Sequence, residues 1–402
     1  MSKHRLFALF LGLGCFDLFA NEFSGRAEIG LTYADTLKSW QDGGTGILRF
    51  DDTSAQLFQG FVSHTSRPLA GLTTHVVANV YADGEQHIGL TQAFAEYKPL
   101  SPNKIRYKLR TGFFYPRYSV ENTSEGWLSP YTYTQSAINS WVGEEIKIPG
   151  VEVALFSNGR RFRSPWSWEV NAALFKGNDP AGTLLAWRGW SYHDRQSLHH
   201  DRINFAPIPT IVNDVVTPTW IDPFDEIDGR WGGYIGLHLN HQHKTVMKYY
   251  YYDNNADPSA ITDIRLYAWA TKFHSLAIKH KLSPTLDLLA QAMAGSTDMG
   301  PSAVYAHFYS AYLMLSHQQD EHRFAIRIEA STVEENNDLM PNDQNDSETS
   351  AITAAWRYSG LPNGEFGIEL HANRNSADNR QQLFIEPDQS DQQIRIVYAM
   401  TF

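Results

Sequence analysis

The sequence predicts an all-β fold in which antiparallel strands close into a barrel that crosses a membrane. Apolar and polar residues alternate in segment after segment, and the last of these segments runs to the terminal Phe402. No stretch after residue 20 approaches the roughly 20 apolar residues that a spanning helix needs. Because a spanning strand needs only every second residue to be apolar, a mean hydropathy of -0.39 is compatible with such a barrel.

The composition excludes several classes of function. The formal net charge of -11 argues against a nucleic-acid partner. The single cysteine, Cys15, lies in the N-terminal segment, so the mature chain is expected to have no disulfide, thiolate metal site or cysteine nucleophile. A lipoprotein anchor at this cysteine is disfavoured, because Gly12 stands where such signals usually have leucine.

The first 20 residues have the three parts of an export signal. A basic start at 3–5 precedes the short apolar run 6–16, and Ala20 provides a small residue before a cut at Asn21. The apolar run is too short to span a bilayer as a helix. We therefore predict a cleaved signal peptide over 1–20 and one barrel domain over 21–402.

The last ten residues form the clearest predicted strand. Every second residue belongs to one wholly apolar face, which consists of Ile394, Ile396, Tyr398, Met400 and Phe402. The opposite face is mixed and includes Arg395. The last strand of a soluble sandwich is the alternative, but such strands seldom stop on a C-terminal Phe. The pattern favours a membrane barrel.

This ending resembles the C-terminal signal of Gram-negative outer-membrane proteins, in which a terminal Phe closes an alternating strand. The resemblance implies location in the outer membrane after Sec-type export, contact with outer-membrane lipid, and recognition of the Phe402 strand by the assembly machinery. It covers the whole chain as a likeness to porin-like proteins as a class, and for a porin of this size it implies a homotrimer.

The same alternation predicts about 16 strands, within a range of about 14 to 18. Within 104–114, for example, mostly apolar residues alternate with Arg106, Lys108 and Arg110. The predicted strands cover 25–34, 47–63, 72–82, 88–98, 104–114, 141–157, 167–176, 231–242, 243–253, 264–282, 285–296, 303–317, 322–333, 349–359, 365–375 and 392–402. The weakest is 141–157, because Pro149-Gly150 interrupts it; this segment is either one bulged strand or a hairpin on the barrel rim.

The connections support this count independently. Every second connection is short and rich in turn residues, such as Ser283-Pro284, whereas most of those between are longer. The longest are 115–140, 177–230, 334–348 and 376–391. Short periplasmic turns that alternate with long extracellular loops are the usual asymmetry of these barrels.

A barrel of about 16 strands is wide enough to leave an aqueous lumen unless loops fill it. The strand faces assigned inward are mainly basic, and the predicted pore-lining residues are Arg106, Lys108, Arg110, Arg323, Arg327 and Glu329. We therefore expect a porin-like channel for passive diffusion of small polar solutes, with a preference for anions. The alternative is that these cations pair with acids on neighbouring strands and only solvate the wall.

The loop 115–140 is the predicted constriction. It follows the fifth strand, where general porins fold a loop into the lumen, and its aromatic and charged side chains suit polar solutes. The residues expected to act there are Tyr115, Arg117, Tyr118, Glu121, Trp127 and Tyr131. They could equally form a packed lid outside the pore.

The longer loop 177–230 contains a His/Asp group that includes His193, Asp194, His199 and His200. It shows no fixed ligand spacing of the helical or zinc-finger type, so no metal and no cofactor is expected. A loop of this length is expected to fold, over or into the pore.

The segment that begins at Ser157 resembles the nucleophile region of the outer-membrane phospholipase family. That family has a histidine two residues before the serine, where this chain has Leu155, so no catalytic residue is assigned and no enzyme is expected. The alternative to a channel is a barrel that its loops plug, with a role in adhesion, assembly or lipid-directed chemistry.

Overall fold

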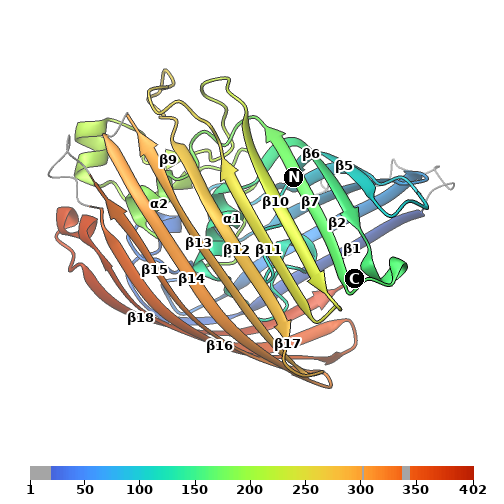
Figure 1. The fold of residues 1–402 in the computed structure, drawn as a ribbon. Helices are drawn as coiled ribbons and strands as arrows, with labels where there is room; N and C mark the ends of the chain where they lie inside the picture. The colour runs from blue at the N-terminus through green and yellow to red at the C-terminus, as the bar shows by residue number, and fades with distance from the viewer. Residues whose placement is uncertain (1–19, 301–302, 337–344) are drawn as a thin grey trace, which may run out of the picture.

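The computed structural model describes residues 20–300, 303–336 and 345–402, and these form one closed barrel of 16 antiparallel strands (Figure 1). The strands of the barrel are β1 (Ala20–Asp35), β2 (Ser54–Leu69), β3 (Leu72–Val80), β4 (Ile88–Tyr97), β5 (Arg106–Phe114), β6 (Ile148–Ser157), β7 (Trp166–Phe175), β10 (Gly232–His241), β11 (Thr245–Asp253), β12 (Ala270–Lys281), β13 (Leu286–Met299), β14 (Val304–Gln319), β15 (His322–Glu335), β16 (Ser347–Leu361), β17 (Gly364–Ala377) and β18 (Asp388–Thr401). Each strand pairs with its neighbour in the sequence, and β1 pairs with β18 to close the sheet. The predicted fold class is confirmed. The predicted signal peptide lies almost wholly outside the described residues.

The last strand shows why the chain forms a barrel with two kinds of face. Ile394, Ile396, Tyr398 and Met400 are 36–44% exposed, whereas the intervening Arg395 is 2% exposed. Side chains of this strand therefore alternate between an apolar outer surface and a covered interior, as the two-residue period predicts. Since every strand has a partner on both sides, no backbone edge is left open to lipid.

Three predicted strands need correction. Residues 264–269 of the predicted strand 264–282 belong to the connection before β12, where Leu266 and Trp269 are buried instead of alternating between two faces. Residues 47–53 of the predicted strand 47–63 belong to the loop before β2, where Ile47 and Leu48 are buried against the barrel filling instead of lying in the sheet. The first part of the predicted strand 141–157 is helical, because α1 (Ala137–Glu145) precedes β6. Pro149 occupies the second position of β6, so neither a bulged strand nor a hairpin is formed there.

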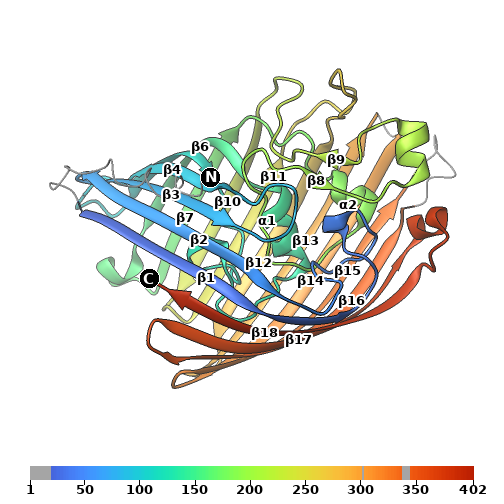
Figure 2. The same ribbon diagram turned by 180° about the vertical axis from the view of Figure 1, so that it is seen from behind.

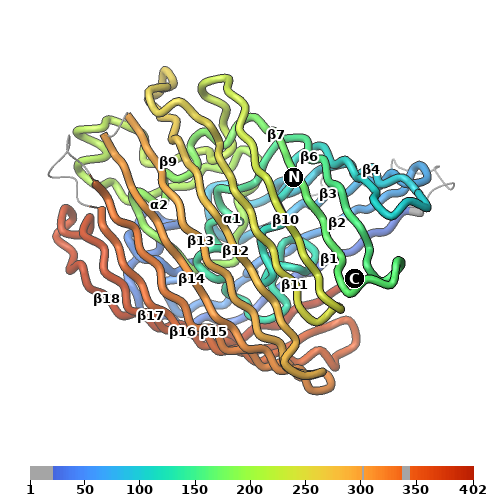
Figure 3. The backbone as a smooth tube through the Cα atoms, viewed as in Figure 1, coloured from blue at the N-terminus to red at the C-terminus, as the bar shows by residue number. Residues whose placement is uncertain are grey.

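The remaining elements lie in the connections. They are η1 (Trp40–Asp42), η2 (Glu125–Trp127), η3 (Gly159–Phe162), α2 (Thr183–Arg188), the strand pair β8 (Ile203–Asn204) and β9 (Trp220–Ile221), η4 (Thr210–Val215) and η5 (Asp378–Leu383). No helix of the described chain is long and apolar enough to cross a membrane. Short turns and the C-terminus gather at one end of the barrel, here called the turn end, and the long connections at the opposite loop end (Figures 1 and 3).

Two long connections fold into the barrel. All residues of 131–148 and 177–198 are buried, and α1 and α2 lie within the ring of strands (Figure 2). Contacts to walls on different sides place them in the lumen: the Ala137 amide bonds to Glu329 of β15, and the rings of Tyr118 and Tyr250 of β11 lie 4.6 Å apart. We call segments 115–147 and 177–198 together the plug.

The seam between β1 and β18 depends on one close approach. A Cβ atom at Gly30 would lie 1.9 Å from the carbonyl oxygen of Ile396, which is part of the neighbouring backbone and cannot turn aside. Two residues away, Thr32 lies on the same strand, is fully buried and already carries a branched side chain. Its hydroxyl has no hydrogen-bond partner among the described residues.

Replacing Gly30 by valine is therefore expected to open the seam. The folded barrel should lose about 1–3 kcal/mol of its free energy of unfolding or more, and its thermal unfolding midpoint should fall. Heat-modified migration on SDS gels and circular dichroism in detergent measure this effect. The matched control, Thr32→Val, keeps a branched side chain and removes only a buried hydroxyl that has no partner among the described residues, so it should stay within about 1 kcal/mol of the wild type. Equal unfolding midpoints for the two variants would contradict the assignment of the seam.

Candidate functional site

One half of the lumen is filled by an apolar core that the plug shares with strands β10 to β15. The Trp141 ring of α1 lies 5.3 Å from both Phe273 of β12 and Phe308 of β14. Leu184 and Leu185 of α2 are fully buried in the same core. The contact is stable because each of these apolar side chains gains free energy from the exclusion of water.

The other half of the lumen is ionic. The plug meets strands β15 to β18 there, and Arg327 of β15 is the central contact, with no exposed surface. Its guanidinium lies 2.7 Å from both Glu121 of the plug and Glu329 of the same strand. It also donates to the carbonyl oxygens of Thr134 and Gln135. A single wall arginine therefore binds both the backbone and a carboxylate of the plug.

Two neighbouring strands hold the same stretch of backbone. Arg357 of β16 donates to the Ser129 carbonyl oxygen at 2.7 Å and forms an ion pair with Glu365 at 2.7 Å. Glu369 of β17 accepts from the amides of Tyr133 and Thr134. We call this contact, between segment 121–136 and β15 to β18, the ionic face of the plug. Both its donors and its acceptors on the wall are charged groups, which form the stronger class of hydrogen bond.

A second ionic contact holds the longer connection. Asp194 lies between Arg49, at 2.6 Å, and Arg395 of β18, at 2.7 Å, and is buried. Arg49 also pairs with Asp83 at 2.7 Å, so three connections and the wall meet at this point. The two guanidinium groups hold the pKa of Asp194 well below its usual range, since they stabilise the ionised carboxylate.

The two parts of the plug are bound to each other by a third ion pair. Arg188 of α2 meets both carboxylate oxygens of Glu144 of α1, at 3.1 and 2.7 Å, and His193 lies 3.6 Å from the same group. The Arg188 guanidinium lowers the pKa of Glu144 to about 2, despite its burial. A bidentate pair fixes the relative orientation of the two helices as well as their charge.

The predicted pore-lining residues all lie on the inner wall, and most are already paired. On β5, Lys108 meets Glu169 at 2.8 Å and Arg110 meets Glu152 at 3.1 Å. The alternative interpretation, pairing with acids on neighbouring strands, therefore describes Arg110, whose partner lies on the adjacent β6. The partner of Lys108 lies one strand further, on β7. Arg106 instead lies over the Phe156 ring at 4.6 Å. The Arg323 guanidinium lies 5.2 Å from the centroid of the Tyr131 ring, which belongs to the plug. A role in solute passage stays a prediction for the whole set.

The residues predicted for a constriction loop are within the lumen and packed. Tyr115 stacks on Trp127 with ring centroids 4.3 Å apart, and Arg117 pairs with Glu96 of the wall at 2.7 Å. Tyr131 accepts a hydrogen bond from Lys279 of β12 at 2.8 Å. Arg117 and Tyr131 therefore bind the plug to the wall, while Tyr115 and Trp127 pack within the plug. Their action on a solute stays a prediction.

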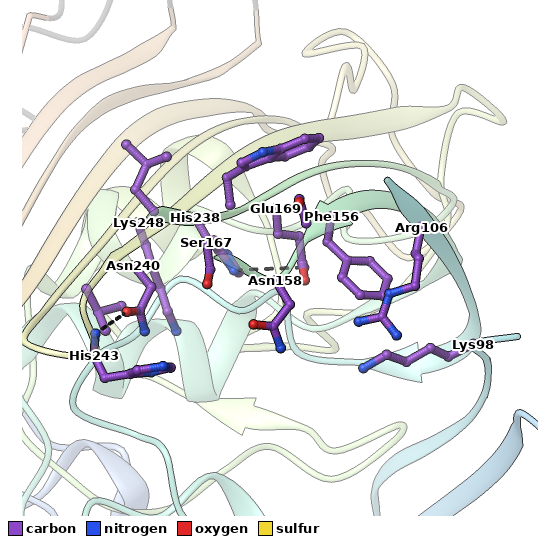
Figure 4. A pocket seen from close by; sticks show the side chains of 14 residues that line it. Lys98, Arg106, Phe156, Asn158, Ser167, Glu169, His238, Asn240, His243 and Lys248 are labelled. Atoms are coloured by element: carbon purple, nitrogen blue, oxygen red, sulfur yellow. Dashed lines mark hydrogen bonds and ion pairs between the residues drawn. The ribbon is translucent and has the colours of Figure 1, made fainter. Parts of the chain in front are cut away.

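A cavity of about 350 Å³ remains at the turn end, on the inner side of strands β4 to β11 (Figure 4). We call it the vestibule. Its charged and imidazole side chains are Lys98, Arg106, Glu169, His238, His243 and Lys248. Figure 4 shows Lys98 and Arg106 pointing into the same space beside Phe156. Both cations lie over the Phe156 ring, and the Lys98 Nζ atom is 5.0 Å from the ring centroid.

The vestibule does not contain the elements of a serine hydrolase among the described residues. Ser157 and Ser167 line it together with His238, but the imidazole Nε2 lies 2.6 Å from the Tyr250 hydroxyl and forms no hydrogen bond with either serine. Leu155 is 49% exposed on the outer face of β6. The arrangement provides no activated nucleophile there.

The His/Asp group of the longer connection is divided among separate contacts. Within the described residues, His200, Asp222 and Asp225 have ligand atoms within 4.8 Å of one another, as do Asp179, Glu226 and Asp228. His200 and Asp222 form a pair at 3.1 Å. Carboxylates of the second group already accept from backbone amides, including those of Ile227 and Gly229. Three candidate ligands at a largely exposed histidine are compatible with a cation but do not require one.

Sequence reasoning missed the residues that hold the longer connection. Arg49, Asp83 and Arg188 lie in irregular segments or a short helix, where no periodicity assigns a direction to a side chain. The one available signal was chemical, because an arginine that becomes buried needs hydrogen-bond acceptors. Arg395 was assigned inward from the alternation of the last strand, but its partner Asp194 lies 201 residues away in the sequence.

Comparison with known proteins confirms the fold. No family model and no curated relative matches the sequence. Among solved structures, the trimer form of OmpT, an outer membrane protein of Vibrio cholerae, has a TM-score of 0.55 at 8% identity and covers 96% of this chain and 100% of its own. OmpF of Salmonella typhi, solved with daunomycin, has a TM-score of 0.54 at 11% identity, covering 95% of this chain and 97% of its own.

The outer membrane channel DcaP of Acinetobacter baumannii is similar to the same degree, with a TM-score of 0.54 at 8% identity over 96% of this chain and 97% of its own. At these identities the likeness concerns the fold. The chain has the closed-barrel fold of these outer-membrane proteins, as the resemblance in the sequence implied.

The Glu144–Arg188 pair gives the plug a defined response to acid. Because the pKa of Glu144 is lowered from 4.5 to about 2, its contribution is fully present above pH 4.5 and is lost as the pH falls towards 2. Glu144→Gln is expected to remove this pH dependence and to weaken the plug by about 3–5 kcal/mol at neutral pH, since a buried arginine loses its partner. Protease cleavage within 115–147 and 177–198 measures release of the plug.

The exposed Glu386 supplies the control, because it has no ion pair among the described residues. Glu386→Gln should keep the acid response and the cleavage rate of the wild type. Cleavage that is equally slow in the two variants at neutral pH would rule out a holding role for Glu144.

Proposed function

We propose that the protein is a porin-like channel of the Gram-negative outer membrane for small polar solutes, and that the plug holds it closed in this conformation. The observation that carries the proposal is the burial of every residue in 131–148 and 177–198 inside a barrel whose wall is lined with charged groups. A purely structural filling would need no charged face. An open pore, in turn, would not be crossed by a packed core.

The apolar side and the ionic face of the plug would lose different amounts of free energy if water entered. On the apolar side, each buried side chain such as Leu184, Trp187 or Trp190 contributes about 1.5–3 kcal/mol, which is lost when water enters. On the ionic face, hydration replaces much of what an ion pair loses, and a solvated pair is worth only about 0–1 kcal/mol. We therefore place the opening along the ionic face, with the apolar side acting as the anchor.

Solute preference follows from which charges move. Arg395 belongs to the wall, whereas Asp194, which neutralises it, belongs to a connection. Displacing that connection leaves Arg395 facing the path and lowers the barrier for anions, while Arg327 keeps Glu329 of its own strand as a partner. Passive diffusion with a weak anion preference is therefore proposed for the opened state, and the plugged barrel for the resting state.

The environment forms part of the same proposal. The apolar outer surface suits outer-membrane lipid, and Phe402 is 72% exposed at the turn end, accessible to assembly machinery. Placing the turn end in the periplasm follows the usual orientation of such barrels. A homotrimer is included because the similar OmpT structure is a trimer form.

Single-channel recording in planar bilayers tests the closed state and the ion pairs of Asp194 that hold it. Wild-type protein should insert but conduct in rare openings, whereas Asp194→Asn should raise the open probability at least about tenfold, because an ion pair in this position contributes more than 1.4 kcal/mol. Openings of the variant should reverse at a potential that indicates anion preference.

Glu386→Gln, an exposed acid outside the plug contacts, should leave the recordings unchanged. Large and stable conductance in the wild type would refute the closed state. Permanently silent wild-type and Asp194→Asn barrels would refute the channel and favour a permanently filled one.

A further inference from the structure

We infer that the vestibule is a binding site for a small polyvalent anion. Three cations line this cavity without a carboxylate partner: Lys98, Arg106 and Lys248 form no ion pair among the described residues. Elsewhere on the inner wall, arginines such as Arg26, Arg327 and Arg357 are each neutralised by an acid. Arg323 of β15 also forms no ion pair among the described residues, but it is a single cation beside the Tyr131 ring. The vestibule differs in gathering three such cations around one cavity.

The only acid of the lining does not supply the missing charge. Glu169 lies 2.8 Å from Lys108, and Arg117 and His238 are each 3.8 Å from it. Its negative charge is thus shared among groups outside the three unpaired cations. Three cations without an ion pair, against one carboxylate that is shared with other groups, leave the local charge positive.

Arg106 shows that a hydrogen-bond acceptor is missing. Its Nε atom is buried and has no partner among the described residues. The guanidinium rests on the Phe156 ring at 4.6 Å and the Lys98 ammonium on the same ring at 5.0 Å. The ring keeps two like charges close together at the edge of one cavity (Figure 4). An anion that accepts from both groups would offset their repulsion.

The cavity has the size and the polar groups for a small ligand. About 350 Å³ lies at the lower end of the range of ligand pockets in proteins. Asn158, Ser167 and Asn240 add neutral donors around the cations. Ammonium and guanidinium groups with such donors match phosphate or carboxylate oxygens, and several negative charges are needed to balance three cations.

This site is separate from the ionic face of the plug, where the opening is proposed. The vestibule lies against β4 to β11, whereas the ionic face of the plug meets β15 to β18, and binding in the vestibule does not require the plug to open. Anion binding in the vestibule and conduction through the barrel can therefore be tested independently of each other. An occupied vestibule would concentrate anions at the turn end of the path.

Titration calorimetry of the whole purified barrel in detergent, with inorganic pyrophosphate at fixed ionic strength, tests the inference. Saturable binding of one anion per chain is expected. Lys98→Gln and Arg106→Gln should each weaken the affinity about tenfold or more, since a hydrogen bond to a charged group contributes a factor of that order. Lys98 is exposed at the end of β4, so its variant should fold even where the Arg106 variant does not.

Lys281→Gln is the matched control, because it removes one exposed positive charge at the end of β12 that has no ion pair among the described residues and lies outside the vestibule. It should bind pyrophosphate as the wild type does. Absence of saturable binding in the wild type, an unchanged affinity in Lys98→Gln, or an equal loss in Lys281→Gln would each overturn the inference.

Discussion

The structure depends on the requirement that no backbone amide or carbonyl remains unpaired in lipid. An antiparallel sheet meets it only by closing on itself, and here the pairing of β1 with β18 completes the ring. Closure at 16 strands then creates a second problem, because a ring of this width encloses more space than its own side chains can fill. The two long connections fill that space.

The filling is built differently on its two sides, and this difference links the structure to function. Aromatic and aliphatic side chains such as Trp141 and Phe308 anchor it to one wall, and arginines such as Arg327 and Arg357 hold it to the other. The first type of contact excludes water, while the second can exchange protein partners for water. A barrel with both has a fixed side and a releasable side.

The strands could be predicted from sequence because lipid and lumen impose opposite chemistry on alternate residues. Ile396 and Arg395 are assigned correctly from their spacing alone. That rule fails where both sides of a segment are covered: residues 137–145 are buried all round, so their helix leaves no two-residue pattern, and Ile47 is apolar because it packs inside the lumen. Lumen contacts join residues distant in sequence, and Glu121 and Arg327, both selected from sequence, could not be recognised as partners.

Hydrogen–deuterium exchange of the reconstituted barrel tests the central claim most directly. If segments 131–148 and 177–198 are a packed filling, their amides should exchange as slowly as those of the barrel strands, and far more slowly than those of the exposed turns. Exchange of both segments within the time taken by the turns would show that the lumen is open to water and would contradict the account.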